Sequence, residues 1–183
     1  MQELALDILD IAQNSVRAAA THIAIEVKEA VRQNRLYLIV ADNGCGMSPE
    51  ELARAADPFY TTRTTRRVGL GLALLQMECE QTGGSLQIIS EPGRGTRIHA
   101  GLGLSHIDRP PLGDVASTLA TLALCCPEIR FTYTHRTENG AFSADTRLLC
   151  YVPDMEPLSL TGKAALLHCM IGRGLERIEG GRI

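Results

Sequence analysis

The chain is expected to turn at Asp42-Asn43-Gly44-Cys45-Gly46-Met47, directly after a run of apolar residues at 35–41. That run is apolar almost throughout, which is typical of a central strand in a sheet. A carboxylate at the end of such a strand, followed by two glycines, lets the backbone approach a flat ligand closely. A buried acceptor there would take a hydrogen bond from an exocyclic amine and repel a carbonyl, so it would favour adenine over guanine. Taken alone, the stretch is equally compatible with a simple turn.

Other segments predict the remaining parts of a nucleotide site. A predicted helix over residues 70–82 opens with Val68-Gly69-Leu70-Gly71-Leu72, and its free N–H groups and partial positive charge suit phosphates. A glycine turn, Gly93-Arg94-Gly95-Thr96, adds another close backbone approach and a hydroxyl. Asn14 lies on a predicted first helix over residues 4–20, where its amide oxygen could ligate Mg²⁺.

The order of predicted elements indicates an α/β layer arrangement. Strands are predicted over 22–27 and 35–41, and a helix capped by Ser48 and opened by Pro49 is predicted to run to about residue 56. A hairpin of strands over 85–90 and 96–102 follows the 70–82 helix.

A second region begins near residue 103. It contains a predicted helix over 112–126, then strands over 129–135 and 141–149 that are joined by the hairpin signal Asn139-Gly140. A final amphipathic helix begins at about residue 160, and Leu166, Leu167, Met170 and Ile171 are expected on one side of it. We therefore expect a domain over residues 1–103 and a helix–hairpin–helix extension over 104–183, able to extend the sheet and to offer a partner or dimer surface.

Composition narrows the class of protein. The 183 residues suit one domain, or a core domain with a small appendage, and the net charge of −3 gives no electrostatic footprint for nucleic acid or an anionic membrane. No stretch approaches the roughly 20 apolar residues of a membrane span, and the start does not resemble a signal peptide. The six cysteines lack metal-ligand spacing, which favours reduced, mostly buried thiols. These features predict a cytoplasmic protein.

Taken together, the motifs resemble those of the GHKL superfamily, which includes gyrases, the large heat-shock chaperones, histidine kinases and MutL mismatch-repair proteins. The resemblance covers residues 4–102 and implies the Bergerat fold, an ATP-binding two-layer α/β sandwich. The matching segments are Asp10-Ile-Ala-Gln-Asn14-Ser for the N box, Asp42-Asn-Gly-Cys-Gly46 for the G1 box, Asp57-Pro-Phe-Tyr-Thr-Thr-Arg63 for the F box, Gly69-Leu-Gly-Leu72 for the G2 box and Gly93-Arg-Gly-Thr96 for the last glycine box.

The resemblance also implies roles for individual residues. Asp42 would contact N6 of adenine with help from Thr96 through water, and Asn14 would hold Mg²⁺. The amides from Gly69 to Leu72 would bind the phosphates. The full set expected to contact ATP is Asn14, Asp42, Gly44, Gly46, Met47, Phe59, Thr62, Arg67, Gly69, Leu70, Gly71, Leu72 and Thr96.

The sequence motifs specify ATP turnover less strongly than ATP binding. Hydrolysing branches carry Glu four residues before the N-box Asn, whereas this chain has Asp10, a candidate general base one methylene shorter. Asp10 is equally compatible with an indirect Mg²⁺ partner or a surface charge. Arg63, Arg66 or Arg67 could neutralise the γ-phosphate, and the alternative is a solvated basic turn. Only residues 64–68 separate the F and G2 boxes, so we expect a short lid and ready nucleotide exchange.

The F and G2 boxes are close to the sensor-kinase pattern. Ser105-His106-Ile107-Asp108-Arg109-Pro110-Pro111-Leu112 resembles the sensor-kinase H box, which makes His106 a candidate phosphoacceptor. Two departures favour a structural histidine that anchors the linker instead. Ile107 stands where an acidic residue is expected, and Pro127 and a hairpin take the place of a second helix.

The resemblance implies ATP-dependent regulation by a kinase-like protein, of histidine or serine type, that acts on or signals to a regulatory protein partner. The chain also resembles small stand-alone members of the superfamily, including anti-sigma-type serine kinases, and a homodimer is compatible with this resemblance. The alternative is a weak ATPase or a non-catalytic ATP-dependent switch that controls protein assembly. A MutL-like clamp is disfavoured because the second region is small and the sequence shows no basic DNA face.

Overall fold

The computed structural model describes residues 3–55, 70–147 and 159–178, and its centre is a six-stranded sheet in the order β3-β4-β2-β1-β5-β6. In chain order its strands are β1 His22–Ala30, β2 Arg35–Asp42, β3 Ser85–Glu91, β4 Gly95–Gly103, β5 Arg130–Thr137 and β6 Gly140–Asp145. The helices are α1 Leu4–Arg17, α2 Pro49–Leu52, α3 Leu70–Gln81, α4 Val115–Cys125 and α5 Leu160–Ile178, with a short 3-10 turn, η1, at Val31–Gln33.

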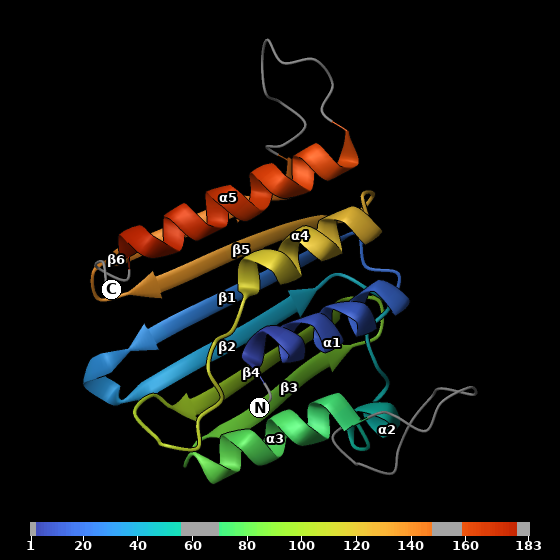
Figure 1. The fold of residues 1–183 in the computed structure, drawn as a ribbon. Coiled ribbons are helices and arrows are strands. Elements are labelled where there is room, and N and C mark those ends of the chain that lie inside the picture. Colours follow the sequence, from blue (N-terminus) through green and yellow to red (C-terminus); the bar gives the residue numbers. More distant parts are fainter. Residues whose placement is uncertain (1–2, 56–69, 148–158, 179–183) are drawn as a thin grey trace.

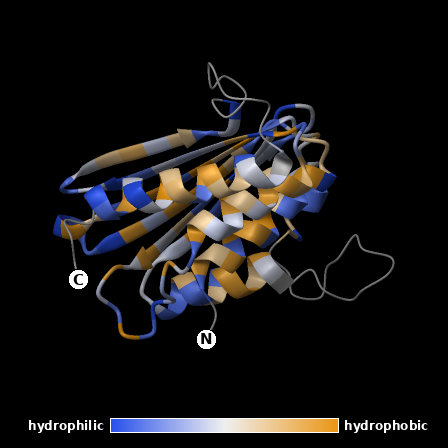
Figure 2. Ribbon diagram, turned by 45° about the horizontal axis from the view of Figure 1, so that its top comes forward, coloured by the Kyte–Doolittle hydropathy of each residue, from blue (hydrophilic) through white to orange (hydrophobic). Residues whose placement is uncertain are grey.

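Helices α1, α3, α4 and α5 lie over one face of the sheet (Figure 1). Burial along the strands follows from this arrangement, because alternate side chains of a strand point to opposite faces. In β1, Ile23, Ile25 and Val27 are buried, and the residues between them are only half-buried. Hydrophobic and hydrophilic residues are interspersed along the helices (Figure 2), as expected for helices that pack on one side. The predicted α/β two-layer sandwich is confirmed.

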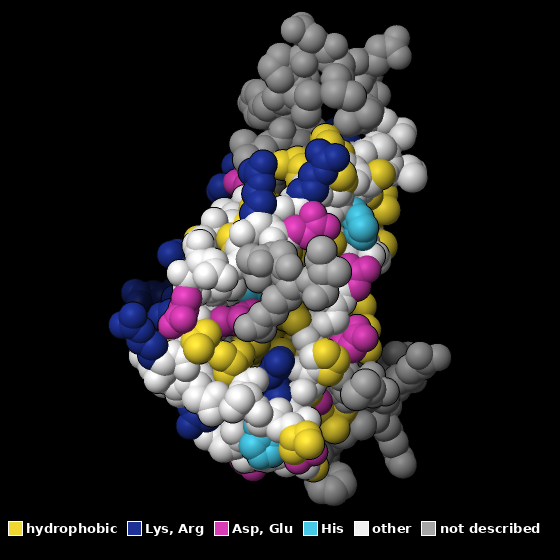
Figure 3. Space-filling view, turned by 60° about the vertical axis from the view of Figure 1, so that its left-hand side comes forward, with side chains coloured by type: hydrophobic (Ala, Val, Ile, Leu, Met, Phe, Trp, Pro, Cys, Tyr) yellow, Lys and Arg dark blue, Asp and Glu magenta, His cyan; other side chains and the backbone are white. Residues whose placement is uncertain are grey.

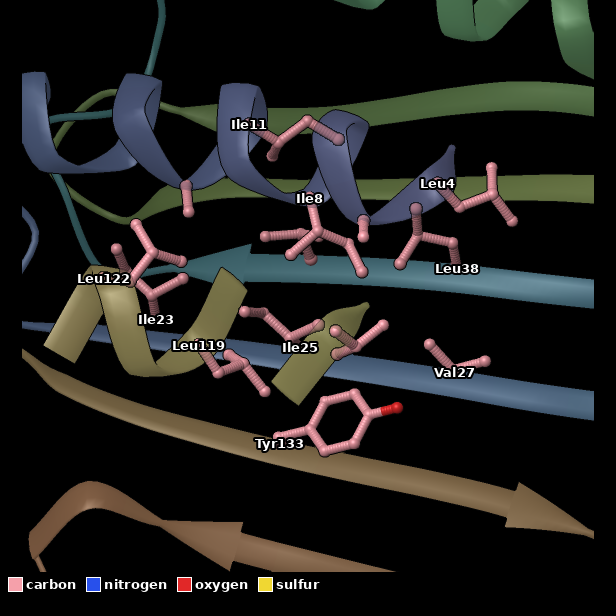
Figure 4. Packing of buried hydrophobic residues seen from close by; sticks show 14 of the residues in the cluster. Leu4, Ile8, Ile11, Ile23, Ile25, Val27, Leu38, Leu119, Leu122 and Tyr133 are labelled. Atoms are coloured by element: carbon pink, nitrogen blue, oxygen red, sulfur yellow. The ribbon is translucent and has the colours of Figure 1, made fainter. Parts of the chain in front are cut away.

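One hydrophobic core joins the two regions of the sequence. Ile8 and Ile11 of α1 face Ile25 of β1, and Leu119 of α4 and Tyr133 of β5 complete the same cluster (Figure 4). The predicted 129–149 hairpin continues the sheet, because β5 pairs in parallel with β1, from His22 opposite Arg130 to Lys28 opposite Arg136. The nucleotide-box region and the second region therefore share a sheet and a core.

Several predicted boundaries are wrong for identifiable reasons. Helix α2 ends at Leu52 rather than near residue 56, because it buries no side chain that would carry it past its capping box. Helix α4 begins at Val115 rather than 112, because Gly113 has a φ of +73° and Asp114 caps the helix by accepting from the Ser117 amide. Strand β6 ends at Asp145 rather than 149.

Three burial expectations also need correction. Met170 is 39% exposed, whereas Leu167 and Ile171 are buried, so the apolar side of α5 is narrower than predicted. Strand β2 is central, but its side chains are buried on one face only, since no helix covers its other face in Figure 1. Among the described cysteines Cys79 is buried, and Cys45, Cys125 and Cys169 are exposed, so the thiols are not mostly buried.

Candidate nucleotide-binding site

Asp42 is the last residue of β2, and its carboxylate is held by donors from three parts of the chain. The Ser15 hydroxyl of α1 donates to Oδ2 at 2.6 Å. The Gly44 amide donates to Oδ1 at 2.9 Å, and the Thr96 amide of β4 donates to the same oxygen at 3.2 Å. The carboxylate is half-buried. It is therefore fixed in one orientation and keeps accepting capacity for a further donor, as adenine recognition requires.

The G1 glycines allow a close approach between this turn and the β3–β4 turn. Gly46 has a φ of +68°, and a Cβ at this position would overlap the Glu91 carbonyl oxygen. A Cβ on Gly44 would lie 2.6 Å from the Ala18 carbonyl oxygen. Both positions therefore exclude any larger residue without a backbone shift.

A serine links the two turns. Ser90 of β3 accepts a hydrogen bond from the Met47 amide at 2.9 Å, and its Oγ lies 2.9 Å from the Thr96 hydroxyl. The Met47 and Thr96 positions predicted from sequence are thus brought together beside Asp42. Thr96 donates to Asp42 through its backbone amide, and its water-mediated help to adenine stays a prediction.

The end of α1 and the start of α3 form the other side of the site. Asp10 and Asn14 are both exposed and lie one helical turn apart on α1. Arg17 Nη1 donates to Asn14 Oδ1 at 3.0 Å. A Cβ on Gly71 would lie 3.1 Å from Asp10 Oδ2, so the G2 glycine of α3 sits directly beside the candidate general base.

The remaining residues predicted to contact ATP lie either at the start of α3 or outside the described part of the chain. Leu70 begins α3, and Leu72 is partly buried with its side chain packed against the core. Six of the predicted residues, and the lid expected over 64–68, lie outside the described part of the chain: Phe59, Thr62, Arg63, Arg66, Arg67 and Gly69.

The structure places His106 far from Asp42. Thr96 is the second residue of β4, and His106 follows the end of that strand, where its Nδ1 accepts from the Asp108 amide at 3.2 Å. Since a strand rises about 3.3 Å per residue, the length of β4 separates His106 from Thr96 by about 20 Å or more. His106 lines a hollow of about 510 Å³ with Arg35 and Thr82 at that opposite end of the sheet.

On the face of the molecule shown in Figure 3, basic side chains (Lys and Arg) and acidic side chains (Asp and Glu) are mixed.

Sequence reasoning did not assign a role to Ser15, Asn43 or Ser90. Asn43 Oδ1 accepts from the Thr21 and His22 amides, both at 2.9 Å, and so ties the G1 turn to the start of β1. The available signal for Ser15 was a hydroxyl at an apolar helix position, where burial demands a partner. Asn43 and Ser90 carry no comparable signal, because their partners are distant in the sequence.

Below the phosphate side of the site, α1 and α3 meet through two carboxyl groups. Burial, followed by the Asp7 carboxylate and a hydrogen bond with it, raises the pKa of Glu78 to about 7. Asp7 is itself only 3% exposed. When Glu78 carries its proton, it can hydrogen-bond to Asp7 and so join α3 to α1.

None of the helices in the described residues is both long and apolar enough to cross a membrane.

Comparisons with known proteins agree with this geometry. Residues 3–106 match the family model described as histidine kinase-, DNA gyrase B-, and HSP90-like ATPase. The sensor protein kinase FleS of Pseudomonas aeruginosa is 42% identical over 89 residues, covering 49% of this chain and 22% of that protein. A putative sensor protein of Shewanella frigidimarina is 35% identical over 109 residues, covering 58% of this chain and 17% of that protein. This chain thus spans less than a quarter of the length of either relative.

A likeness to a solved structure extends further along the chain. The N-terminal domain of a DNA repair protein superposes with a TM-score of 0.57 and 16% identity, covering 89% of this chain and 56% of that one. At this identity the likeness concerns the fold alone. Since the family match at residues 3–106 takes in more than half of the 183 residues, the chain belongs to the histidine kinase-, DNA gyrase B- and HSP90-like ATPases of the GHKL superfamily.

Proposed function

We propose that this chain binds ATP with Mg²⁺ and acts as a kinase-like regulatory protein that transfers phosphate to, or signals to, a protein partner. The observation that carries the proposal is the Asp42 carboxylate, fixed by Ser15, Gly44 and Thr96 at the end of β2. Membership of the ATPase family and the similarity to sensor proteins support the kinase-like part of the proposal.

Different described residues bind different parts of ATP. Asp42 accepts the exocyclic amine of adenine, and its negative charge rejects a carbonyl at that place. Gly44 and Gly46 keep the floor of the site free of side chains. The first amides of α3 face the phosphates, helped by the positive end of the helix dipole.

The residues present fit Mg²⁺, because Asn14 and Asp10 offer exposed oxygen ligands one helical turn apart. Asn14 would hold the ion, which would neutralise charge on the phosphates. Since Arg17 donates to the same Asn14 oxygen, its guanidinium has to move away as a second cation approaches.

A weak ATPase is the second candidate function, and the contact between Asp10 and Gly71 favours it. A carboxylate beside the glycines of the phosphate loop is placed to orient a water molecule. The shorter Asp side chain makes this a slow reaction compared with a Glu at the same position. If turnover is negligible, the same site serves as an ATP-dependent switch.

Incubation of the whole chain with γ-labelled ATP separates these functions. Label retained on the protein and lost in His106→Ala identifies an autokinase, and label passed to a co-purifying protein identifies a kinase for that partner. Because β4 separates His106 from its own nucleotide site, autophosphorylation has to occur between two copies, and its specific rate should rise with protein concentration. Released phosphate that is lost in Asp10→Asn identifies the ATPase.

Asp42→Asn is the control for the site itself. The substitution keeps the shape but replaces an acceptor with an amide that donates toward the adenine amine, so ATP affinity should fall by about tenfold or more. Normal ATP binding by Asp42→Asn would overturn the adenine assignment. ATP binding without transfer, hydrolysis or any nucleotide-dependent partner would overturn the kinase-like function.

A further inference from the structure

A hollow lies between α4 and α5 at the end of the sheet where β5 begins. Its volume is about 270 Å³, and it is lined by the last turn of α4, the first residue of β5, the residues after β6 and the first turn of α5. His22 pairs with Arg130 and Ile23 with Asp42 in the sheet register, so this is the same end as the nucleotide site, on the far side of β1. Nothing in the proposed function uses it.

Cations outnumber anions around this hollow. Arg130, Arg147 and Lys163 line it, against a single acidic residue, Glu128. Arg130 is neutralised by Asp145, whose Oδ2 lies 2.5 Å from its Nη2. In the part of the chain that the structure describes, the side chains of Arg147 and Lys163 make no ion pair with a carboxylate. Arg147 and Lys163 therefore stand against one lining carboxylate, Glu128, which leaves an excess of positive charge among the described residues of the hollow.

The start of α5 adds to the positive potential at the hollow. Lys163 lies in the first turn of α5, which has no acidic residue, although the helix dipole favours an anion there and disfavours a cation. An anion in the hollow would offset this unfavourable placement of Lys163.

Apart from Thr146, the remaining lining is apolar. Leu124 is 36% exposed, and the buried Ile129 and Ala164 form part of the wall. An apolar cavity of about 150 Å³ is enough to hold benzene, so this volume suits a small molecule rather than a folded partner. An apolar wall beside two cations matches a ligand with a short apolar body and one charged group.

We propose that this hollow binds a small organic anion, whose carboxylate or phosphate group lies between Arg147 and Lys163 and whose apolar body packs against Leu124 and Ile129. The site goes beyond the proposed function and does not depend on it.

Saturation-transfer NMR on the full chain tests the proposal with three probes of equal chain length: hexanoate, hexyl phosphate and hexanol. At least one charged probe should bind in about the millimolar range expected of so small a ligand, and hexanol should not. The stronger charged probe shows whether the site prefers a carboxylate or a phosphate. Arg147→Gln and Lys163→Gln should each weaken that probe by about tenfold, and Leu124→Ser should weaken it as well.

The matched control is Lys28→Gln, which removes an exposed cation from β1 at the opposite end of the sheet and should leave probe binding unchanged. Asp42→Asn should lose ATP affinity but keep the probe, so failure of one site is distinguishable from failure of the other. The proposal is overturned if neither charged probe binds, if hexanol binds equally well, or if Lys28→Gln weakens the probe as much as Lys163→Gln does.

Discussion

At the scale of single residues, the Asp42 carboxylate shows how a short motif acquires a chemical task. Two of the hydrogen bonds to this carboxylate come from residues 27 positions earlier and 54 positions later in the sequence. The hydrogen bond from the Ser15 hydroxyl is the shorter of the two, and Ser15 itself is only 3% exposed on its helix. A charge-assisted hydrogen bond of this length orients the carboxylate more firmly than a water molecule would.

Replacing Ser15 with Ala should weaken ATP binding. The substitution removes one donor from Asp42 without adding volume, and the expected loss is about tenfold in affinity, measured by titration calorimetry. Ser117→Ala is a close control, because the Ser117 hydroxyl makes the same 2.6 Å bond to a carboxylate, Asp114, on α4. Equal ATP affinities for the two variants would show that Ser15 does not position Asp42.

At the scale of elements, two helices are held by contacts that single substitutions can test. Helix α3 meets α1 through the Asp7–Glu78 carboxyl pair. Helix α5 lies on β6 at Gly174, where a Cβ would overlap the ring of Phe142. The first contact depends on a proton, and the second depends on the absence of a side chain.

The Glu78 contact predicts that stability falls as pH rises through about 7. Because its pKa is raised from 4.5 to about 7 in the folded state, its contribution is fully present below pH 4.5 and is lost as the pH rises through 7. Glu78→Gln keeps the shape of the side chain without the charge. The melting temperature of the variant minus that of the wild type should therefore be about 2–4 °C larger at pH 8 than at pH 5.5. Glu80→Gln, an exposed change on the same helix, is the control. Parallel melting of Glu78→Gln and wild type across this pH range would contradict the shared proton.

The Gly174 contact predicts opposite effects for two glycines of the same helix. Gly174→Ala should destabilise the protein by about 1–3 kcal/mol, because the new methyl group displaces Phe142 and loosens α5 from β6. Gly172→Ala, where nothing lies within 4 Å of the new Cβ, should stabilise it by roughly 0.5–1 kcal/mol through lower backbone entropy. Chemical denaturation measures both, and a stabilised Gly174→Ala would show that Phe142 has room to move.

At the scale of the whole molecule, the parallel pairing of β1 with β5 makes the second region part of the sheet. Without β5, strand β1 becomes an exposed edge, and the core loses Leu119, Leu122 and Tyr133. Exposed edges and apolar patches of this kind lead to aggregation rather than to a stable smaller domain.

A chain that ends at Gly103 should therefore lose cooperative unfolding. We expect a broad thermal transition by circular dichroism and aggregation on size-exclusion chromatography, in contrast to a single sharp transition for the full chain. If the fragment instead melted cooperatively at the same temperature as the full chain, residues 1–103 would form an independent domain, as the sequence analysis expects.

Sequence patterns predicted most of the elements because each rests on local chemistry. The helix start at Leu70, the hairpin turn at Asn139-Gly140 and the Ser48 capping box depend on residues within four positions of one another. Boundaries failed where packing rather than local chemistry decided them, as at the end of α2, which has no buried side chain to continue the helix. The same limit hid Ser90, whose role comes from Met47 on another turn.

By itself, the sequence determined the α/β fold class and the family, and it predicted which carboxylate would face adenine, since all three follow from motifs that are read within a few residues. Tertiary structure alone decided what surrounds that carboxylate and where His106 lies. It also decided that β5 joins β1 and that cations outnumber carboxylates in the lining of the hollow between α4 and α5. The physical reason is that hydrogen bonds, shared protons and electrostatic fields act across space, between residues whose separation along the chain carries no signal of their meeting.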